Sequence, residues 1–315
     1  MKVLANDGIS NSGIVALTEA GYTVITEKVN QEDLIQVINN ENIEILLVRS
    51  ATTARKNLID ACPNLKLIGR GGVGMDNIDV EYARAIGRTV INTPGASSQS
   101  VAELVMGHFF AISRSLHDSY KNMENGDFKT LKKKYGKGVE IRDKNLTIIG
   151  FGRIGQSLAS YAIGCGMNVL ASDLFVSEAA IQLDFFDGQH ATFNIKTAPI
   201  SEVIKQSDFL TLHVPAQKKY VIGKAEIDQM KDGAAIINAA RGGVIDEVAL
   251  VEALDDGKLA FAGLDTFENE PAPALKVLMN GKISLTPHIG AATNEAQDRI
   301  GTELASQIVS IMEKA

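Results

Sequence analysis

Short apolar runs alternate with longer amphipathic stretches along the first part of the chain. The apolar runs predict five strands, at Val3–Ala5, Thr23–Ile25, Ile45–Val48, Leu67–Ile68 and Thr89–Ile91. Between them, stretches such as Asn11–Ala20 and Glu32–Asn39 carry apolar residues at helical spacing. Strands that alternate with helices are typical of βαβ units, which pair their strands in parallel.

A second series of the same kind begins at Leu146. It predicts six further strands, at Leu146–Ile149, Asn168–Ala171, Phe209–His213, Ala235–Asn238, Phe261–Leu264 and Ile283–Leu285. Six strands with helices between them match the number in a complete dinucleotide-binding sheet. One amphipathic helix, Asn294–Lys314, is expected to close the chain. The pattern therefore predicts an α/β protein with two doubly wound parallel sheets.

A long helical pattern and a basic stretch separate the two series. Apolar residues recur at helical spacing from about Ser98 to Asn125, which is long for one helix and typical of a spine or a subunit contact. We therefore expect a homodimer through the 98–125 region. Residues 126–145 are polar and include Lys132-Lys133-Lys134, and we interpret them as a solvated loop.

Composition narrows the classes of function. The chain has 315 residues, more than one hydrophobic core usually organises, which favours two domains. Its net charge of −7 argues against nucleic acid as a partner, because a nucleic-acid binder usually carries a basic excess. Two cysteines, Cys62 and Cys165, form no metal-ligand set, read as small buried apolar residues, and fit a reducing compartment. The N-terminus lacks the pattern of a signal peptide, and apolar runs such as Ile43–Val48 are too short to span a membrane. We expect a cytoplasmic protein with no membrane partner and no bound metal.

A glycine-rich turn follows the first strand of the second series. The segment Gly150-Phe151-Gly152-Arg153-Ile154-Gly155 lies between that strand and a helix-forming stretch. The first glycine permits a tight turn, the second lets a pyrophosphate approach the backbone, and the third lets the helix pack on the strand. The N–H groups at the start of the helix would then face the phosphates. The alternative is an ordinary turn between a strand and a helix.

An acidic residue, Asp173, follows the next predicted strand. Its carboxylate can accept hydrogen bonds from the ribose hydroxyls of an adenosine, and its charge would repel a 2′-phosphate. With the strand, the glycine turn and the helix, this residue favours a dinucleotide site, and the expected cofactor is NAD rather than NADP.

Three side chains near the ends of later strands indicate the chemistry. Arg241, Glu270 and His288 each follow a predicted strand, and doubly wound sheets bind ligands at the carboxyl ends of their strands. His288 can accept a proton, Glu270 can fix its tautomer, and Arg241 can bind a carboxylate. This trio suits the oxidation of a 2-hydroxy acid, in which a nicotinamide takes the hydride. Taken singly, each residue has a structural alternative: a histidine held after a proline, a Glu-Pro turn, and an arginine surface contact.

Together these motifs resemble the D-2-hydroxyacid dehydrogenase family, and within it the D-3-phosphoglycerate dehydrogenases. The resemblance covers nearly the whole chain, with motifs in family order at residues 69–79, 92–94, 150–155, 213–215, 238–243, 263–267 and 287–293. It implies a Rossmann cofactor domain, residues 94–289, inserted into a flavodoxin-like substrate domain of residues 1–93 and 290–315. It also implies that Arg241, Glu270 and His288 are the catalytic residues.

The resemblance assigns further binding residues. Besides the glycine turn and Asp173, it implies cofactor contacts from Arg153, Ile154, His213, Pro215, Ala239, Arg241, Asp265, His288 and Gly290. Among these, Asp265 would hold the nicotinamide carboxamide. It implies substrate contacts from Arg49, Ser50, Arg70, Gly72, Val73, Gly74, Arg241 and His288. In some relatives a basic residue at the place of Lys132–Lys134 enters the site of the partner subunit.

The implied reaction is the NAD-dependent oxidation of 3-phospho-D-glycerate to 3-phosphohydroxypyruvate, a step of serine biosynthesis. Arg49 and Arg70 would bind the substrate phosphate, because a dianion needs such charge. Alternatively, Arg49 pairs with a nearby acid. Three residues depart from the pattern of that subfamily: Ser97 stands where Asn is common, Phe128 where Trp is common, and Leu174 where Pro is common. The chain has no room for the regulatory domain of many such enzymes, so we expect no feedback inhibition by serine.

Two other functions stay open. A hydroxypyruvate or glyoxylate reductase of the same family would use substrates that lack only the phosphate. An NAD(H)-sensing transcriptional co-regulator would share the fold, but the complete trio and the absence of basic patches argue against it. A panel of 2-hydroxy and 2-keto acids, assayed through the absorbance of NADH, would separate these functions.

Overall fold

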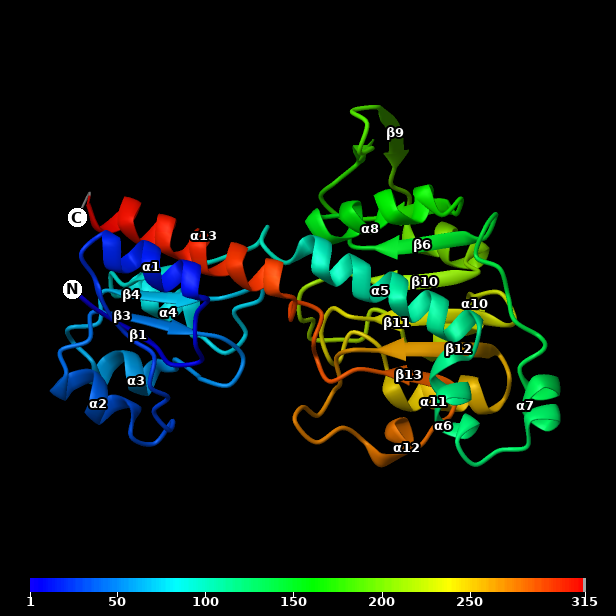
Figure 1. Ribbon diagram of the computed structural model, residues 1–315, viewed down its shortest axis with the longest axis horizontal. Coiled ribbons are helices and arrows are strands. Elements are labelled where there is room, and N and C mark those ends of the chain that lie inside the picture. The colour runs from blue at the N-terminus through cyan, green and yellow to red at the C-terminus, as the bar shows by residue number, and fades with distance from the viewer. Residues whose placement is uncertain (314–315) are drawn as a thin grey trace. The chain divides into compact units, whose positions relative to one another are not determined.

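The computed structural model describes residues 1–313, so Lys314 and Ala315, at the expected end of the last helix, lie outside the described residues. The chain divides into two compact units, one of residues 1–98 with the segment from Ala291 onward, the other Gln99–Gly290 (Figure 1). Both boundaries fall within a few residues of the domain limits expected from the sequence. Within the described part of the chain, no helix is both long and apolar enough to cross a membrane.

The first unit is built on a five-stranded parallel sheet in the order β2-β1-β3-β4-β5. Its strands are β1 (Lys2–Ala5), β2 (Thr23–Ile25), β3 (Ile45–Val48), β4 (Leu67–Arg70) and β5 (Thr89–Asn92). Its helices are α1 (Asn11–Glu19), α2 (Leu34–Asn40), α3 (Lys56–Ala61), α4 (Val80–Ala85) and α13 (Asn294–Met312). The chain builds outward on one side of β1 and then on the other, which places the topological switch point between β1 and β3.

Helices cover both faces of this first sheet. One core joins the sheet to α2, α3 and α4 through side chains such as Leu34 and Leu58. The other joins it to α1 and α13 through Leu17, Leu304 and Ile308. Every residue of β3 is at most 2% exposed, as expected for a continuous apolar run between two helical layers. The C-terminal helix therefore completes the unit that the N-terminus begins.

The second unit has a six-stranded parallel sheet in the order β13-β12-β11-β10-β6-β7. Its strands are β6 (Asn145–Ile149), β7 (Asn168–Ser172), β10 (Phe209–Leu212), β11 (Ala234–Asn238), β12 (Leu259–Leu264) and β13 (Ile283–Leu285). A parallel bridge between Ala171 and Thr197 adds the start of a further strand beside β7. The switch point lies between β6 and β10. The predicted fold class, two doubly wound parallel sheets, is confirmed.

Helices also cover both faces of the second sheet. One core contains residues of α5 (Ser98–Ser113) and α8 (Arg153–Gly164), including Phe109 and Leu158. The other contains residues of α10 (Lys224–Gln229), α11 (Glu247–Asp255) and α12 (Leu275–Leu278), including Ile227 and Leu250. The short α9 (Ile200–Val203) continues into a 3-10 turn, Ile204–Gln206.

Two expectations about the region between the strand series are wrong. The single helix expected over 98–125 is two helices, α5 and α6 (Leu116–Met123), because Ser115 adopts a left-handed backbone with φ 50°. The expected loop over 126–145 contains α7 (Phe128–Lys134), whose first turn is capped by Asp127 through a 2.8 Å bond from the Thr130 N–H. Capping rather than apolar periodicity marks this helix, and only Leu131 of it is buried.

Smaller differences occur at the ends of elements and in one long connection. The second helix begins at Leu34 rather than Glu32, β10 ends before His213, and Cys165 is only half-buried. The stretch after Asp173 contains an unpredicted antiparallel hairpin, β8 (Glu178–Asp184) and β9 (His190–Lys196), which stands out from the sheet in Figure 1. Apolar residues on its inner side, such as Ile181, join the core that α8 covers.

Candidate active site

The glycine turn joins β6 to α8 at the switch point of the second sheet. Gly150 has φ 89°, and a Cβ on it would lie 2.5 Å from the carbonyl oxygen of His213. A Cβ on Gly155 would lie 2.3 Å from the carbonyl oxygen of Gly150. The packing of the protein itself therefore requires the first and third glycines.

The middle glycine, Gly152, is not required by the packing of the protein itself. A Cβ on Gly152 would meet nothing within 4 Å, and its backbone, with φ −77°, is open to any residue. Gly152 is also the N-cap of α8, where no side chain caps the free N–H groups of Arg153 and Ile154. Open space beside uncapped N–H groups suits the pyrophosphate of a dinucleotide, so the residues present fit NAD at this turn.

Asp173 holds the glycine turn as well as marking the end of β7. Its Oδ2 accepts a 2.6 Å bond from the N–H of Phe151, and its Oδ1 accepts bonds from the N–H groups of Phe175 and Val176 at 2.7 and 3.0 Å. Burial would raise the pKa of Asp173, but these N–H donors together hold that pKa below its ordinary value. Backbone N–H groups of this loop therefore occupy most of the acceptor positions of the carboxylate, which number about four.

His213 follows β10, directly across the switch point from the turn. Its Nε2 lies 3.3 Å from the Thr211 hydroxyl, while its buried Nδ1 has no hydrogen-bond partner among residues 1–313. Burial lowers the pKa of His213 to about 3, which keeps its ring neutral. A buried nitrogen without a partner beside the turn fits the expected contact with a cofactor, as a neutral rather than a charged group.

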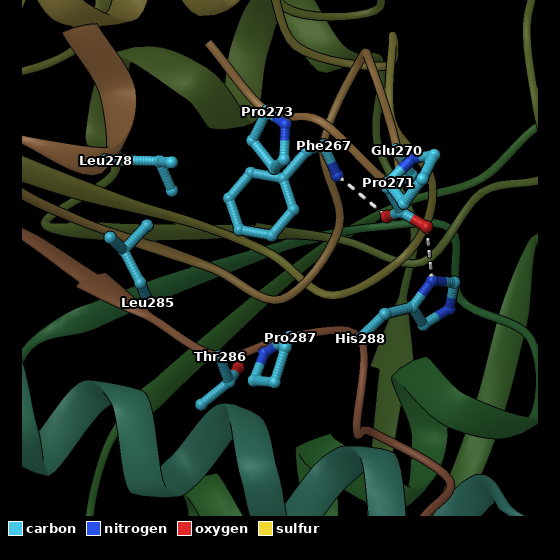
Figure 2. A pocket seen from close by; sticks show the side chains of 9 residues that line it. All are labelled: Phe267, Glu270, Pro271, Pro273, Leu278, Leu285, Thr286, Pro287 and His288. Carbon is cyan, nitrogen blue, oxygen red and sulfur yellow. Dashed lines mark hydrogen bonds and ion pairs between the residues drawn. The ribbon is translucent and has the colours of Figure 1, made fainter. Parts of the chain in front are cut away.

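His288 and Glu270 form a hydrogen-bonded pair beyond the ends of β13 and β12 (Figure 2). His288 Nδ1 lies 2.8 Å from Glu270 Oε2, and Glu270 Oε1 accepts a 3.0 Å bond from the Phe267 N–H. A carboxylate only accepts hydrogen bonds, so His288 carries its proton on Nδ1 and leaves Nε2 able to accept one. Both side chains are 36% exposed, which leaves this nitrogen accessible to a ligand.

Asp265 fixes the loop that carries His288. It directly follows β12, is 1% exposed, and accepts bonds from the Ile289 and Gly290 N–H groups at 2.8 and 2.9 Å. The Thr286 hydroxyl donates a third bond, of 2.7 Å. Protein groups therefore occupy most of the hydrogen-bond acceptor positions of Asp265, the residue expected to hold the nicotinamide carboxamide.

Arg241 lies on the loop after β11. The Asn238 side chain donates to the Arg241 carbonyl at 2.8 Å, and the Arg241 guanidinium donates to the Ala240 carbonyl at 2.6 Å. The next residue, Gly242, lies so close to the Phe267 carbonyl that a Cβ would come within 1.8 Å of its oxygen. Only glycine permits this approach, which brings the loop of Arg241 against the loop of Glu270.

A cavity of about 440 Å³, not expected from the sequence, adjoins the His288–Glu270 pair. Its lining is mainly apolar and consists of Phe267, Glu270, Pro271, Pro273, Leu278, Leu285, Thr286, Pro287 and His288 (Figure 2). The three prolines are the only sign of it in the sequence, because the other lining residues come from separate elements.

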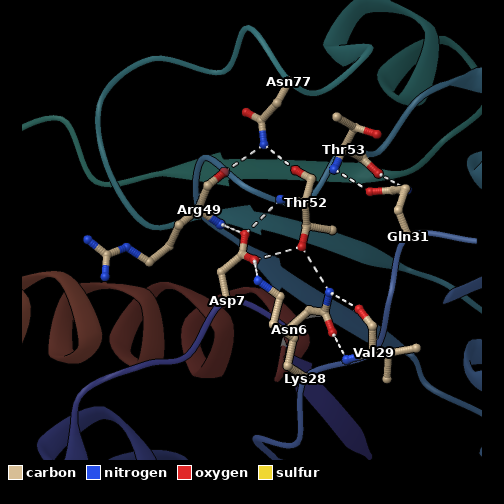
Figure 3. A network of polar contacts seen from close by, with 9 residues as sticks. All are labelled: Asn6, Asp7, Lys28, Val29, Gln31, Arg49, Thr52, Thr53 and Asn77. Atoms are coloured by element: carbon tan, nitrogen blue, oxygen red, sulfur yellow. Dashed lines mark hydrogen bonds and ion pairs between the residues drawn. The ribbon is translucent and has the colours of Figure 1, made fainter. Parts of the chain in front are cut away.

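In the first unit, Asp7 holds the loop after β3 (Figure 3). Its Oδ2 accepts bonds from the N–H groups of Arg49 and Thr52 at 2.7 and 3.0 Å, and its Oδ1 accepts the Thr52 hydroxyl at 2.8 Å. Asn77 donates to the carbonyls of the same two residues at 2.7 and 2.6 Å. Sequence reasoning missed both residues, although the position of Asp7 after β1, beside β3, was a usable signal.

The substrate-binding residues expected in the first unit gather at the carboxyl ends of β3 and β4. The Arg70 guanidinium donates to the Ser50 hydroxyl at 3.4 Å and lies against Gly72, whose φ of 142° excludes a side chain there. The Arg49 side chain extends away from the carboxylate of Asp7 in Figure 3. Its guanidinium forms no ion pair with any described residue, so the alternative of a nearby acid finds no support.

Comparison with known proteins places these features in a family. Residues 106–290 match the model of the D-isomer specific 2-hydroxyacid dehydrogenase NAD-binding domain. The chain is similar to the hydroxypyruvate reductase of Thermotoga maritima, with 41% identity over 98% of this chain and 97% of that protein. It is also similar to the D-3-phosphoglycerate dehydrogenase of Methanocaldococcus jannaschii, with 38% identity over 99% of this chain and 57% of that protein. The chain thus spans a little over half the length of that second relative.

A solved structure shows the same relationship. The NAD⁺-bound 3-phosphoglycerate dehydrogenase of Entamoeba histolytica superposes with a TM-score of 0.78 and 28% identity, over 99% of this chain and 95% of that one. The expected family and the expected cofactor, NAD, are confirmed. We conclude that the chain belongs to the D-isomer specific 2-hydroxyacid dehydrogenase family, a family of NAD-dependent oxidoreductases.

Proposed function

We propose that the protein oxidises a D-2-hydroxy acid to the 2-keto acid with NAD. One observation carries the proposal: an oriented His288–Glu270 pair, with Nδ1 and Oε2 2.8 Å apart, on the unit that binds the dinucleotide. NAD, when bound, accepts the hydride from C2 of the substrate. The protein must then remove the hydroxyl proton and hold the substrate carboxylate.

His288 Nε2 accepts the proton of the C2 hydroxyl, because Nδ1 already donates to Glu270. The imidazolium that forms is stabilised by the adjacent Glu270 carboxylate. Arg241 binds the substrate carboxylate with two parallel N–H donors and thereby orients C2. In the reverse direction the protonated His288 returns its proton to the oxygen of the keto group.

The substrate that we propose is 3-phospho-D-glycerate, oxidised to 3-phosphohydroxypyruvate. Its phosphate is bound by Arg49 and Arg70, with the Ser50 hydroxyl and the Gly72–Gly74 backbone as further contacts. Support comes from the Arg49 guanidinium, which has no acidic partner in the described chain, and from the contact between Arg70 and Ser50. The similarity to phosphoglycerate dehydrogenases supports the same choice.

A second candidate is the reduction of hydroxypyruvate or glyoxylate. It is favoured by one observation: the hydroxypyruvate reductase relative is 41% identical to this chain, and the phosphoglycerate dehydrogenase relative is 38% identical. The two candidates share all of the chemistry at His288 and differ only in the need for a phosphate site.

Replacing Arg49 tests this choice. For phosphohydroxypyruvate, Arg49→Gln should lower kcat/KM about tenfold or more, because a charge-assisted bond to the phosphate is lost. For hydroxypyruvate, kcat/KM should change little. Arg55→Gln is the matched control, since Arg55 already pairs with Asp79 at 3.0 Å. Equal losses on both substrates would favour the reductase, and NADH binding without any turnover would favour the transcriptional co-regulator.

Two further parts of the proposal have their own measurements. Asp173 binds the adenosine ribose, so turnover with NADP should be far below that with NAD, and equal turnover would contradict this role.

The protein forms a homodimer through α5 and α6, which expose the apolar side chains of Phe110, Leu116 and Tyr120 at 45%, 51% and 85%. Sedimentation at micromolar concentration should give twice the chain mass, and a monomer would refute the interface.

A further inference from the structure

A buried histidine lies beneath the loop of His288 and takes no part in the proposed chemistry. His108, on α5, is 3% exposed. Its Nδ1 is 3.0 Å from the Ser284 hydroxyl, and its Nε2 is 3.0 Å from the Thr286 hydroxyl. Both hydroxyls belong to the segment that runs from β13 into the His288 loop. A polar side chain therefore occupies a position where a helix facing a sheet usually places an apolar one.

The hydrogen atoms in this chain of contacts can be assigned. Asp265 accepts two backbone N–H bonds, from Ile289 and Gly290, and therefore also accepts the 2.7 Å bond from the Thr286 hydroxyl. Thr286 has one hydroxyl proton, so it must accept its second bond from His108 Nε2–H. His108 Nδ1 is then unprotonated and accepts the proton of Ser284. The geometry therefore fixes the tautomer of His108 and the donor and acceptor of each hydrogen bond in the series.

The electrostatic setting keeps that tautomer in place. Burial lowers the pKa of His108; the carboxylate of Asp265 opposes this effect and the neighbouring His117 adds to it. The ring is therefore neutral, with one donor and one acceptor, as the two hydroxyls require.

This series of hydrogen bonds ends at the N–H groups of Ile289 and Gly290, the two residues that follow His288. His288 has a left-handed backbone, with φ 54°, which a non-glycine residue keeps only where surrounding contacts hold it. Here the holding contacts are the Ile289 and Gly290 N–H bonds to Asp265. We propose that His108 is a positioning residue that, through Thr286 and Asp265, fixes the backbone on which His288 is aligned with the substrate. This inference rests on the proposed function of His288.

Four variants test the proposal. His108→Leu and Thr286→Val each break the chain, whereas His108→Gln keeps a donor in the place of Nε2 and should restore most of the activity. With the best substrate of the wild-type protein, each breaking variant should lower kcat by about tenfold, with KM changed less, because misplacing a base slows the chemical step. The double variant should lose no more than either single one, since both act through the same bonds. Phe109→Leu is the matched control, because Phe109 is fully buried on the same helix and lies outside the chain of bonds.

A second readout needs no turnover. Hydrogen exchange followed by mass spectrometry should be faster in the peptide containing Ile289 and Gly290 for His108→Leu, and unchanged there for Phe109→Leu. Faster exchange in a protein that turns over no 2-hydroxy or 2-keto acid would refute the proposed function and leave the loop-fixing role standing. Unchanged exchange, additive losses in the double variant, or no rescue by His108→Gln would each overturn the inference.

Discussion

Single residues in this protein are oriented by acidic groups that do not themselves touch the proposed substrate. Glu270 fixes the His288 ring, Asp265 fixes the His288 backbone, and Asp7 fixes the loop of Arg49. Each carboxylate accepts two or more bonds, at least one of them from a backbone N–H. Because these bonds include backbone N–H groups, each of these residues also organises the loop that donates them.

The ring of His213 gives a prediction about pH. Its folded-state pKa is about 3 and its unfolded value about 6.5, so between these pH values the unfolded chain binds one more proton. Stability should therefore fall as the pH drops from 6.5 towards 3, with up to about 1.4 kcal/mol per pH unit due to this residue. His213→Gln should remove that part of the slope in urea unfolding curves, measured across this range.

Other groups leave part of the slope in place, because the pKa of His108 is also lowered. The exposed His190 provides the control, since His190→Gln should leave the slope unchanged. A slope that is the same in His213→Gln and the wild-type protein would show that folding does not lower the pKa of this ring.

At the scale of elements, the contact between α1 and α13 holds the two ends of the chain in one unit. A Cβ on Gly13 would lie 2.9 Å from the backbone of Gly301. A Cβ on Gly301 would come within 2.1 Å of the Ser10 hydroxyl and 3.3 Å of the Gly13 Cα. The helices therefore approach closely at a pair of glycines, a role that helical periodicity alone does not reveal.

Enlarging one of these glycines should push the helices apart. Gly301→Val is expected to lower the free energy of unfolding by about 1–3 kcal/mol, because a tight packed contact becomes overfilled. Gly107→Ala in α5 is the control: a Cβ there meets nothing within 4 Å, so it should raise stability by up to about 1 kcal/mol through helix propensity. Chemical unfolding gives the free energy of unfolding of both variants. Equal changes in the two would show that the glycine contact does not constrain the helices.

At the scale of the whole molecule, one unit is continuous in sequence and the other is not. Gln99–Gly290 contains a complete sheet with helices on both faces and two buried cores of its own. The first unit takes Ile300, Leu304 and Ile308 of its second core from the far end of the chain. The inserted segment should therefore fold alone, whereas the first 98 residues should not.

Fragments of the chain test whether each unit folds on its own. Residues 99–290 should unfold cooperatively and bind NADH without turnover. Residues 1–98 should stay unfolded, because the sheet face that α13 covers would be exposed to water. Joining Ser98 to Ala291 by a short linker should restore folding, since the 2.7 Å bond from Ser100 to the Gly290 carbonyl keeps the ends of the insertion close. Circular dichroism during heating distinguishes these cases, and a cooperative transition in residues 1–98 alone would contradict the account.

Local sequence patterns were sufficient to predict the strands that are buried on both faces. The strand Ile45–Val48 was predicted with its observed limits, because a buried parallel strand is a continuous apolar run. The helix over Phe128–Lys134 was missed because it is largely exposed and carries little apolar periodicity. The hairpin after Asp173 was missed although Ala191, Phe193 and Ile195 alternate with polar residues, which is the spacing of a strand with one buried face. The break at Ser115 was missed for a related reason: a single left-handed residue leaves the apolar spacing on either side intact.

The sequence by itself determined the α/β class, the glycine turn and the chemical types at Arg241, Glu270 and His288, because motif and spacing are properties of the chain. Tertiary structure alone decided which groups meet: Glu270 with His288, Asp7 with the loop of Arg49, and His108 with Thr286. It also decided that Gly152 borders open space while Gly150 and Gly155 border backbone. The physical reason is that hydrogen bonds and packing act over a few ångströms, and only folding brings residues from distant parts of the chain within that range.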